Sequence, residues 1–367
     1  MLLSSIYYFH LFYILRMKFI FKIISLILVV LLLVYCAYSY FFSTTHIAEI
    51  INKNKKHYSI ILAENDNLLI NINAEELRPL ASIVKLIIAV EFAEQVANKT
   101  INESTLVSIK DLESYHVPNT DGNAHKDWLK HIRESNKIVN LDSISLLEIA
   151  KGMITYSSNA NTEYLLDKLG IDNVNIQLKK LGFKTHSKIS YPVSDMYLTS
   201  EELGNDSREN LYHKSNLTHQ KLKSGELLSE NFDSDVDFTK AKQKLLNDRL
   251  SQSTAHEYYK LMIKFRDKNY FKKDVQDILY KIIERRATSE EYDIIRYCSK
   301  GGSTSWVLNN VVYLERKNGK MYVLILFSNY PTNDNDNFLI SKTMGKLINE
   351  ITVGTNRSEK LINIINE

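Results

Sequence analysis

Hydrophobic residues are concentrated first in a long run near the N-terminus. Residues 23–42 read IISLILVVLLLVYCAYSYFF and contain no charged side chain. A helix of about 20 apolar residues can cross the hydrocarbon core of a membrane. Because Lys18 and Lys22 precede the run, the positive-inside rule places residue 17 and earlier in the cytoplasm and the rest of the chain on the far side. The pattern therefore predicts an N-terminal transmembrane helix within residues 1–45.

Two other interpretations of this run stay open. The small residues of Ala37-Tyr38-Ser39 would suit cleavage of a signal peptide, and Cys36 would be a site for a lipid, although Tyr35 before it fits a lipobox poorly. We favour an uncleaved anchor because the run is longer than the apolar core of a usual signal peptide. Met17, which is followed by Lys-Phe-Ile-Phe-Lys, is also a more natural start than Met1.

Beyond the apolar run, the pattern predicts strands, then helices, and then strands again. Two short runs around the turn residues 64–67 predict a β-hairpin, and Asn318-Gly319 predicts a second hairpin near the C-terminus. Between the hairpins, apolar residues recur at helical spacing. The predicted strands are 57–63, 67–73, 294–299, 307–314 and 321–327, and the clearest helices are 82–97, 143–154, 161–169, 256–265 and 337–351.

This order predicts an α/β fold of the α+β type. The two hairpins can share one antiparallel sheet, formed by N- and C-terminal strands and flanked by helices, with an all-helical lobe inserted between them. The sheet lobe would comprise residues 46–100 plus 290–367, and the helical lobe residues 101–289. Within the helical lobe, residues 200–245 are polar and weakly periodic, which is typical of a mobile insertion or of surface helices.

Composition narrows the functional classes. The chain of 367 residues is 44% hydrophobic and 24% charged, with a net charge of +3, so it lacks the one-sided basic field of a nucleic-acid-binding protein. Cys36 and Cys298 do not make a disulfide framework, and the ten histidines show no metal-ligand spacing. We expect no cofactor, no metal ion and no nucleic-acid partner.

A serine and a lysine stand three residues apart at the start of a predicted helix, as Ser82-Ile83-Val84-Lys85. That spacing puts both side chains on one helix face, about 5–6 Å apart at Cβ. A neutral lysine there can take the proton of the hydroxyl and make it a nucleophile. A surface serine and lysine would be the simpler interpretation, but residues 86–90 make the helix apolar almost all round, so it is buried.

Two further polar motifs lie farther along the chain. Tyr156-Ser157-Ser158-Asn159-Ala160-Asn161 separates two apolar helical patterns, and Cys298-Ser299-Lys300-Gly301-Gly302-Ser303-Thr304 ends a predicted strand. In isolation, the first is usually only a loop and the second a strand end with a solvated lysine. The two glycines would, however, let a ligand backbone approach closely.

In this order the three motifs resemble those of the superfamily of class A β-lactamases and penicillin-recognising serine D,D-peptidases. Pro79 to Lys85 is similar to the family's P-x-A-S-x-x-K, and Ser157 to Asn159 is similar to its S-D-N. Lys300 to Ser303 is similar to its K-T-G or K-S-G with the next residue. The likeness covers roughly residues 50–352, and the three motifs together are far more specific than any one of them.

The resemblance implies a role for each matched polar residue. Ser82 would be acylated, with Lys85 as its base, either directly or through water. For that, Lys85 must be neutral part of the time, and burial and the second cation Lys300 would both lower its pKa. Ser157 would relay a proton to the leaving nitrogen, and Asn159 would hold Lys85 and a substrate amide.

The resemblance also implies a substrate-binding strand end. Lys300, with the hydroxyls of Ser303 and Thr304, would bind the substrate carboxylate beside Gly302. Backbone N–H groups of Ser82 and Ser303 would form the oxyanion hole.

Three departures from the family pattern matter. Ser158 replaces the usual Asp, and Gly301 replaces the usual Thr or Ser, which removes one hydroxyl from the carboxylate site. The stretch that matches the deacylating glutamate, residues 181–195, holds no Glu. Glu201, in the sequence Glu-Glu-Leu-Gly-Asn, is a near miss and the possible deacylating base, and Asp195 is a weaker candidate.

The resemblance implies a serine hydrolase of class A β-lactamase type that opens β-lactam amides through an acyl-Ser82 intermediate. Loss of the deacylating Glu and a membrane anchor would favour the alternative, a D-alanyl-D-alanine peptidase acting on peptidoglycan stem peptides. A non-turnover penicillin-binding sensor is the third alternative. We expect a monomer in the bacterial inner membrane, with a single pass through residues 23–42 and the catalytic part in the periplasm or outside. Secretion after signal cleavage is the alternative location.

Overall fold

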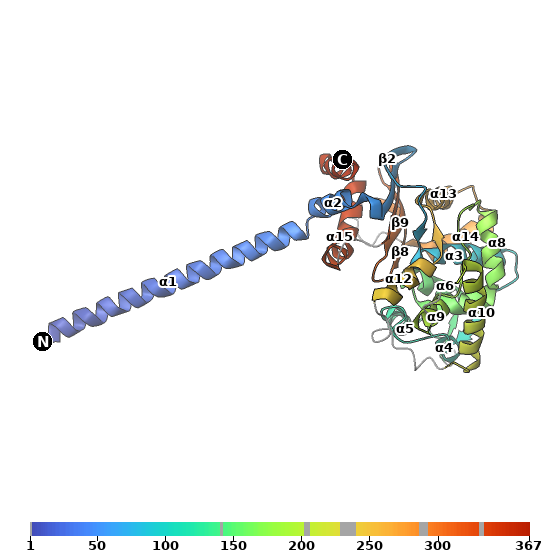
Figure 1. Ribbon diagram of the computed structural model, residues 1–367, viewed down its shortest axis with the longest axis horizontal. Coiled ribbons are helices and arrows are strands. Elements are labelled where there is room, and N and C mark those ends of the chain that lie inside the picture. Colours follow the sequence, from blue (N-terminus) through green and yellow to red (C-terminus); the bar gives the residue numbers. More distant parts are fainter. Residues whose placement is uncertain (1, 140–141, 202–205, 228–239, 286–292, 330–333) are drawn as a thin grey trace. The chain divides into compact units, whose positions relative to one another are not determined.

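The computed structural model describes residues 2–139, 142–201, 206–227, 240–285, 293–329 and 334–367 (Figure 1). The chain divides into two compact units. One comprises the N-terminal residues up to Lys53 together with Phe338–Ile365, and the other comprises Asn54–Asn337. The division of the second unit into a sheet lobe and a helical lobe stays a prediction.

The first unit contains the long N-terminal helix α1 (Leu2–Phe41), α2 (Thr44–Lys53), most of α15 (Asp334–Thr352) and α16 (Asn356–Asn366). Within α1, Arg16–Phe41 is long and apolar enough to cross a membrane, with a mean hydropathy of 2.9. A helix of this kind suits either a signal peptide or a membrane anchor. Polar contacts join α2 to the C-terminal helices, because Arg357 donates to both Glu350 (2.7 Å) and Thr44 (2.9 Å).

An antiparallel sheet in the order β2-β1-β10-β9-β8-β7 is the framework of the second unit. The N-terminal hairpin joins the C-terminal strands because β1 pairs with β10 along its whole length. The predicted α/β fold, with one antiparallel sheet built from both ends of the chain, is therefore confirmed. The strands are β1 (Tyr58–Glu64), β2 (Asn67–Ile72), β7 (Glu284–Arg285), β8 (Ile294–Ser303), β9 (Leu308–Arg316) and β10 (Met321–Ser328).

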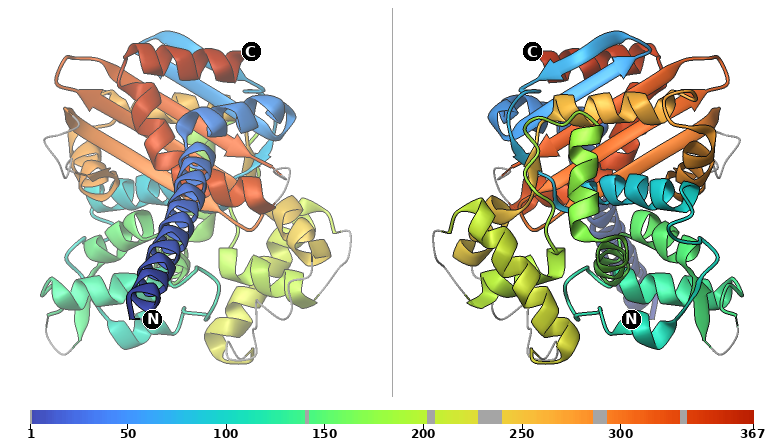
Figure 2. Two further views of the ribbon diagram at one scale, coloured as in Figure 1. Left: turned by 90° about the vertical axis from the view of Figure 1, so that its left-hand side faces the viewer. Right: turned by 90° about the vertical axis from the view of Figure 1, so that its right-hand side faces the viewer.

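The buried helix α3 (Lys85–Ala97) is the centre of the helical part. Its side chains are buried without interruption from Lys85 to Ala93, as the nearly continuous apolar sequence predicts. The helices that pack against α3 are α6 (Leu146–Thr155), α7 (Asn159–Leu169), α8 (Ile171–Lys180) and α14 (Lys273–Ile283). On the same face of the sheet as α3, α13 (Ala255–Arg266) lies over β10, β1 and β9 (Figure 2).

Side-chain caps fix where three of these helices begin. Ser145 caps α6, Ser158 caps α7 and Thr254 caps α13, each by accepting a backbone N–H three residues on. The smaller elements nearby are β4 (Leu106–Ser108), α4 (Ile109–Glu113), α5 (Ala124–Glu134) and β5 (Ser143–Ser145). The cap on α7 matters most, because that helix starts within the second polar motif.

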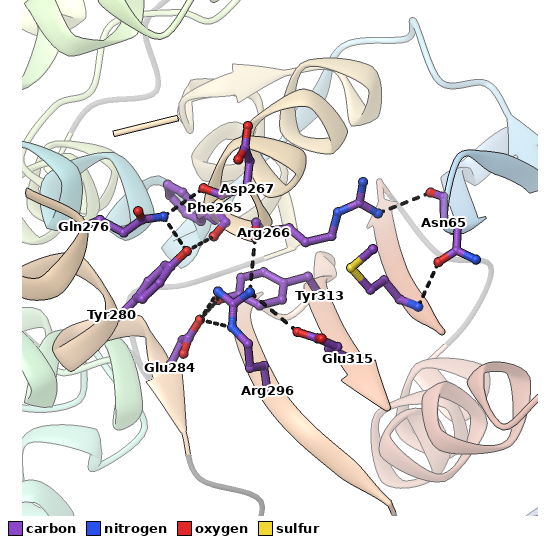
Figure 3. Close-up of polar contacts among 11 residues, drawn as sticks. Asn65, Phe265, Arg266, Asp267, Gln276, Tyr280, Glu284, Arg296, Tyr313 and Glu315 are labelled. Atoms are coloured by element: carbon purple, nitrogen blue, oxygen red, sulfur yellow. Dashed lines mark hydrogen bonds and ion pairs between the residues drawn. The ribbon is translucent and has the colours of Figure 1, made fainter. Parts of the chain in front are cut away.

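Arg296 ties the start of β8 to its neighbours (Figure 3). Its guanidinium donates to Glu284 of β7 (3.0 Å from Nε) and to the backbone oxygen of Arg266 at the end of α13 (3.2 Å). The guanidinium also lies 4.8 Å from the ring centroid of Tyr280 and 5.4 Å from that of Tyr313. These contacts fix the strand whose other end carries the third polar motif.

Residues 188–251 form an excursion whose two ends lie side by side, and we name this segment the 188–251 loop. Ser187 and Gln252 flank it and bond each other, from Ser187 N to Gln252 O (2.9 Å) and from Gln252 N to Ser187 Oγ (2.8 Å). The loop contains α9 (Pro192–Glu201), α10 (Arg208–Ser224) and α12 (Lys240–Arg249). The polar insertion expected at 200–245 thus carries helices, and its residues 202–205 and 228–239 lie outside the described part of the chain.

Candidate functional site

Ser82 lies in a short 3-10 turn, Ala81–Val84, just before α3 begins at Lys85. Two residues before this turn, Pro79 lies in β3 (Arg78–Pro79), which pairs with β6 (Gln252–Ser253) just after the 188–251 loop. Ala81, next to Ser82, adopts a φ of 47°, which is uncommon for a residue with a side chain.

The turn that carries Ser82 is pinned from two sides. From β9, Asn309 Nδ2 donates to Pro79 O (2.7 Å) and Leu80 O (3.2 Å). From the end of the 188–251 loop, Ser251 O accepts Leu80 N at 2.9 Å. A residue held by backbone contacts of this kind keeps a strained conformation that the local sequence alone would not adopt.

Lys85 is buried, with 1% of its surface exposed, and its Nζ has three polar contacts. It lies 2.8 Å from Asn159 Oδ1, 2.6 Å from Ser157 O and 3.2 Å from Ser157 Oγ. Burial lowers the pKa of Lys85 to about 7, although the charges of Asp121 and Glu163 act in the opposite direction. A large share of this lysine is therefore neutral at pH 7, as a general base requires.

Ser157 lies between two lysines. Lys300 Nζ on β8 is 2.9 Å from Ser157 Oγ, on which Lys85 Nζ also converges. Lys300 is itself 3% exposed, so both lysines are buried at this hydroxyl. When the oxygen accepts from two amines, its own O–H is left to donate to a third group. The structure thus brings together Lys85, Ser157 and Lys300, which come from three distant parts of the sequence.

The second motif is fixed by the loop before α5. Asn159 Nδ2 donates to Thr120 O (2.8 Å), and Asn159 N donates to Asp121 Oδ2 (3.1 Å). Ser158 stands in place of the family's Asp, and its hydroxyl meets His125 Nδ1 at 2.9 Å and caps α7. The side chain of Ser158 therefore has a structural role here, and Asn159 contacts the lysine.

The third motif packs directly on the Ser82 turn. A Cβ atom added to Gly302 would lie 2.5 Å from Leu80 O and 3.0 Å from Ser82 N, so only glycine fits. Ser303 is the exposed last residue of β8. The hydroxyl of Thr304 donates to Asn247 Oδ1 of α12 at 2.7 Å, which joins the 188–251 loop to the strand end.

Both candidate deacylating residues belong to α9. Glu201 is the last residue of α9, and its side chain lies outside the described residues. Asp195 is a partly buried residue of α9 whose carboxyl accepts the hydroxyl of Ser190, and desolvation raises its pKa to about 7. The carboxylates whose charges act on Lys85 are those of Asp121 and Glu163 instead.

Sequence reasoning missed four residues that shape this site. Glu163 follows Asn159 by one helical turn, a spacing that would have signalled it. Asp121, Asn247 and Asn309 lie in segments without any matching motif, and only tertiary contacts bring them to the site. Within the described ranges, no group of three His, Cys, Asp or Glu side chains is arranged to hold a metal ion.

Comparisons with known proteins reveal related structures. The TLA-3 extended-spectrum β-lactamase aligns with a TM-score of 0.53 and 16% identity, over 88% of this chain and 98% of its own. A β-lactamase from Sphaerobacter thermophilus DSM 20745 aligns with a TM-score of 0.52 and 15% identity, over 85% of this chain and 97% of its own. A β-lactamase from Chitinophaga pinensis DSM 2588 aligns with a TM-score of 0.51 and 15% identity, over 83% of this chain and 98% of its own. No curated protein sequence matches this chain.

At this level of identity the structural likeness shows a shared fold. The family assignment comes from the sequence profile of the β-lactamase enzyme family, which matches residues 43–352. This range contains all three polar motifs and the strands and helices that position them. The chain belongs to the β-lactamase enzyme family.

Proposed function

We propose that this chain is a serine hydrolase of class A β-lactamase type, which opens β-lactam amides through an acyl-Ser82 intermediate. The observation that supports this most is the buried Lys85, one helical turn after Ser82, with a pKa of about 7 and a direct contact to the Ser157 hydroxyl. A buried lysine without a function would only lower the stability of the fold, because burial penalises its charged form.

In the proposed reaction, Lys85 and Ser157 relay a proton from the Ser82 hydroxyl to the leaving nitrogen of the substrate. Neutral Lys85 Nζ takes the Ser82 proton as Ser82 Oγ bonds to the amide carbonyl carbon. When the C–N bond breaks, the Ser157 hydroxyl gives its proton to the leaving nitrogen, and the Lys85 ammonium restores it across their 3.2 Å contact. Lys85 ends neutral, so acylation needs no outside acid or base.

The strand end would bind the substrate. Lys300, which contacts Ser157, offers a positive charge to the substrate carboxylate, and Ser303 offers an exposed hydroxyl beside it. Backbone N–H groups of Ser82 and Ser303 would hold the oxyanion, because Gly302 keeps β8 against the Ser82 turn. Thr304 takes part less directly, since its hydroxyl already donates to Asn247.

One observation favours slow deacylation and hence the second function, a D-alanyl-D-alanine peptidase or a penicillin-binding sensor. The two carboxylates that act on Lys85 already accept backbone N–H groups, Asp121 from Asn159 and Glu163 from Val193. A carboxylate engaged in this way is less available to activate the hydrolytic water. Release of the acyl group would then be the slow step.

The test is the intact mass of the full-length chain in detergent, followed over time with a penicillin. We expect an adduct of one drug molecule in the wild type and in Ser114→Ala, which changes an exposed serine, and none in Ser82→Ala. An adduct that persists in Ser82→Ala would contradict the assignment of the nucleophile. Rapid return to the free mass with consumption of drug indicates a β-lactamase, and a lasting adduct indicates the second function.

We further propose that the N-terminal helix is retained as a membrane anchor. Its apolar segment Arg16–Phe41 is longer than the apolar core of a usual signal peptide. The protein should therefore be found in the membrane fraction of an expressing bacterium, with a mass that includes this segment. A soluble periplasmic form whose N-terminus lies near Ser39 would show cleavage instead.

A further inference from the structure

Four charged side chains form a ladder between α7 and α10. On α7, Glu163 and Asp167 are one turn apart, and on α10, His219 and Lys223 are also one turn apart. His219 Nδ1 lies 2.8 Å from Glu163 Oε2, its Nε2 lies 3.8 Å from Asp167 Oδ1, and Lys223 pairs with Asp167. With His219 protonated, the ladder holds two negative and two positive charges.

His219 is held in its protonated form at neutral pH. Burial alone would lower its pKa, but its interactions with Asp167 and Glu163 outweigh burial and raise the pKa to about 9. The ring of Tyr191 stacks on the imidazole at 3.6 Å, and the ring centroid of Tyr115 lies 6.0 Å away. The hydroxyl of Tyr115 donates to Asp167, which stabilises the carboxylate that His219 faces.

Glu163 connects this ladder to the 188–251 loop and to the candidate site. Its Oε1 accepts the backbone N–H of Val193 at the start of α9 (2.8 Å). One helical turn before Glu163 stands Asn159, whose Oδ1 accepts from Lys85 Nζ at 2.8 Å. The side chain of Glu163 is 3% exposed, so its charge acts on Lys85 through the protein interior with little screening by water.

We propose that Glu163 and His219 are a positioning pair with two roles. The pair holds the 188–251 loop against α7, and the balance of its two charges sets the fraction of Lys85 that is neutral. An uncompensated Glu163 carboxylate, one turn from Asn159, would keep the proton on Lys85. The positive charge of His219 cancels that effect while the carboxylate continues to hold Val193. This inference rests on the proposed role of Lys85 as the base in acylation.

Charge changes in the two members of the pair should move the pKa of Lys85 in opposite directions. Glu163→Gln keeps an oxygen for Val193 N and removes the negative charge, so the pKa of Lys85 should fall by roughly half to one unit. His219→Gln leaves Glu163 uncompensated, so the pKa should rise by a similar amount. In the double variant E163Q/H219Q both charges are absent, and the pKa should return close to the wild-type value.

The measurement is a ¹³C NMR titration of the full-length chain, labelled at the lysine ε-carbon and solubilised in detergent. Loss of one signal in Lys85→Arg assigns the Lys85 resonance. His213→Gln is the matched control, because this histidine lies on the same helix but is 69% exposed and pairs with the exposed Glu209. The control should leave the titration of Lys85 unchanged.

Shifts of opposite sign that cancel in the double variant would support the pair, and shifts of one sign or no shifts would overturn it. Thermal unfolding checks that each variant is folded, and if Glu163→Gln does not fold, the sign of the His219→Gln shift decides. The titration needs no substrate. A chain that penicillin never acylates would therefore refute the proposed function without affecting this result, and an unchanged Lys85 would refute the pair without affecting the function.

Discussion

Replacing Lys85 with methionine is expected to slow acylation of Ser82 by penicillin about a thousandfold. Methionine is of similar length but cannot take the proton of the Ser82 hydroxyl or return one to Ser157. In the wild-type chain the rate should rise about tenfold per pH unit up to about pH 7 and then level off. Only neutral Lys85 accepts a proton, and burial lowers its pKa to about 7. Quenched mass spectrometry between pH 5 and pH 9 measures both effects.

The same substitution should change how stability depends on pH. The pKa of Lys85 is about 7 in the folded chain and 10.5 as its ordinary value, so between these two values the unfolded chain binds a proton that the folded chain has released. The free energy of unfolding therefore rises with pH between these two values. Below pH 7, Lys85 is charged in both states, so the folded chain bears the full cost of burying the cation. Relative to Lys85→Met, the wild type should gain about 2.5 kcal/mol between pH 6 and pH 9.

Denaturant unfolding of both chains at pH 6 and pH 9 tests this change. Lys110→Met serves as the control, since Lys110 is exposed on α4 and should alter neither the rate nor the pH dependence. If the wild type and Lys85→Met keep the same difference in unfolding free energy at both pH values, the lowered pKa of Lys85 is wrong. If the rate profile is flat while the stability difference changes, Lys85 titrates as described but does not act as the base.

The parts of the fold that the sequence predicted well depend on local chemistry. Asn318-Gly319 specifies the turn between β9 and β10, and Gly319 adopts the positive φ, 79°, that such a turn needs. The apolar sequence of α3 requires burial wherever the helix lies. Ser82, Ser157 and Lys300 were found because each motif has a fixed local spacing, and their convergence followed only from the family resemblance.

What the sequence did not predict depends on contacts between distant polar segments. The 188–251 loop is closed by Ser187 and Gln252, neither of which carries a hydrophobic or turn signal. The pairing of β3 with β6 joins two short segments that lie far apart in the sequence. Asn309 fixes the Ser82 turn with a single side-chain amide from β9. The sequence alone does not distinguish a strand asparagine that holds a functional turn from one that has no such contact.

Gly301 and Gly302 are expected to respond very differently to alanine, although they are neighbours on β8. A Cβ at Gly302 would meet Leu80 O at 2.5 Å, Ser82 N at 3.0 Å and Ile83 Cγ1 at 3.0 Å. Two of these are backbone atoms of the pinned turn, so the strand and Ser82 must move apart. Overpacking of this kind costs about 1–3 kcal/mol of stability. A displacement of about 1 Å at the nucleophile can slow its reaction about a hundredfold.

At Gly301 the added Cβ would meet only Asn309 O at 3.8 Å and Asn310 Oδ1 at 3.9 Å, which are ordinary contacts on an exposed residue. Gly301→Ala should therefore keep the wild-type melting temperature and the wild-type rate of acylation by penicillin. In Gly302→Ala, the melting temperature and the rate of acylation should both fall. Equal loss in the two variants would mean that β8 tolerates no side chain at this end for a reason other than its contact with Leu80. Loss confined to Gly302→Ala would show that the distance between β8 and the Ser82 turn controls reactivity, since the two substitutions differ only in what the new methyl group touches.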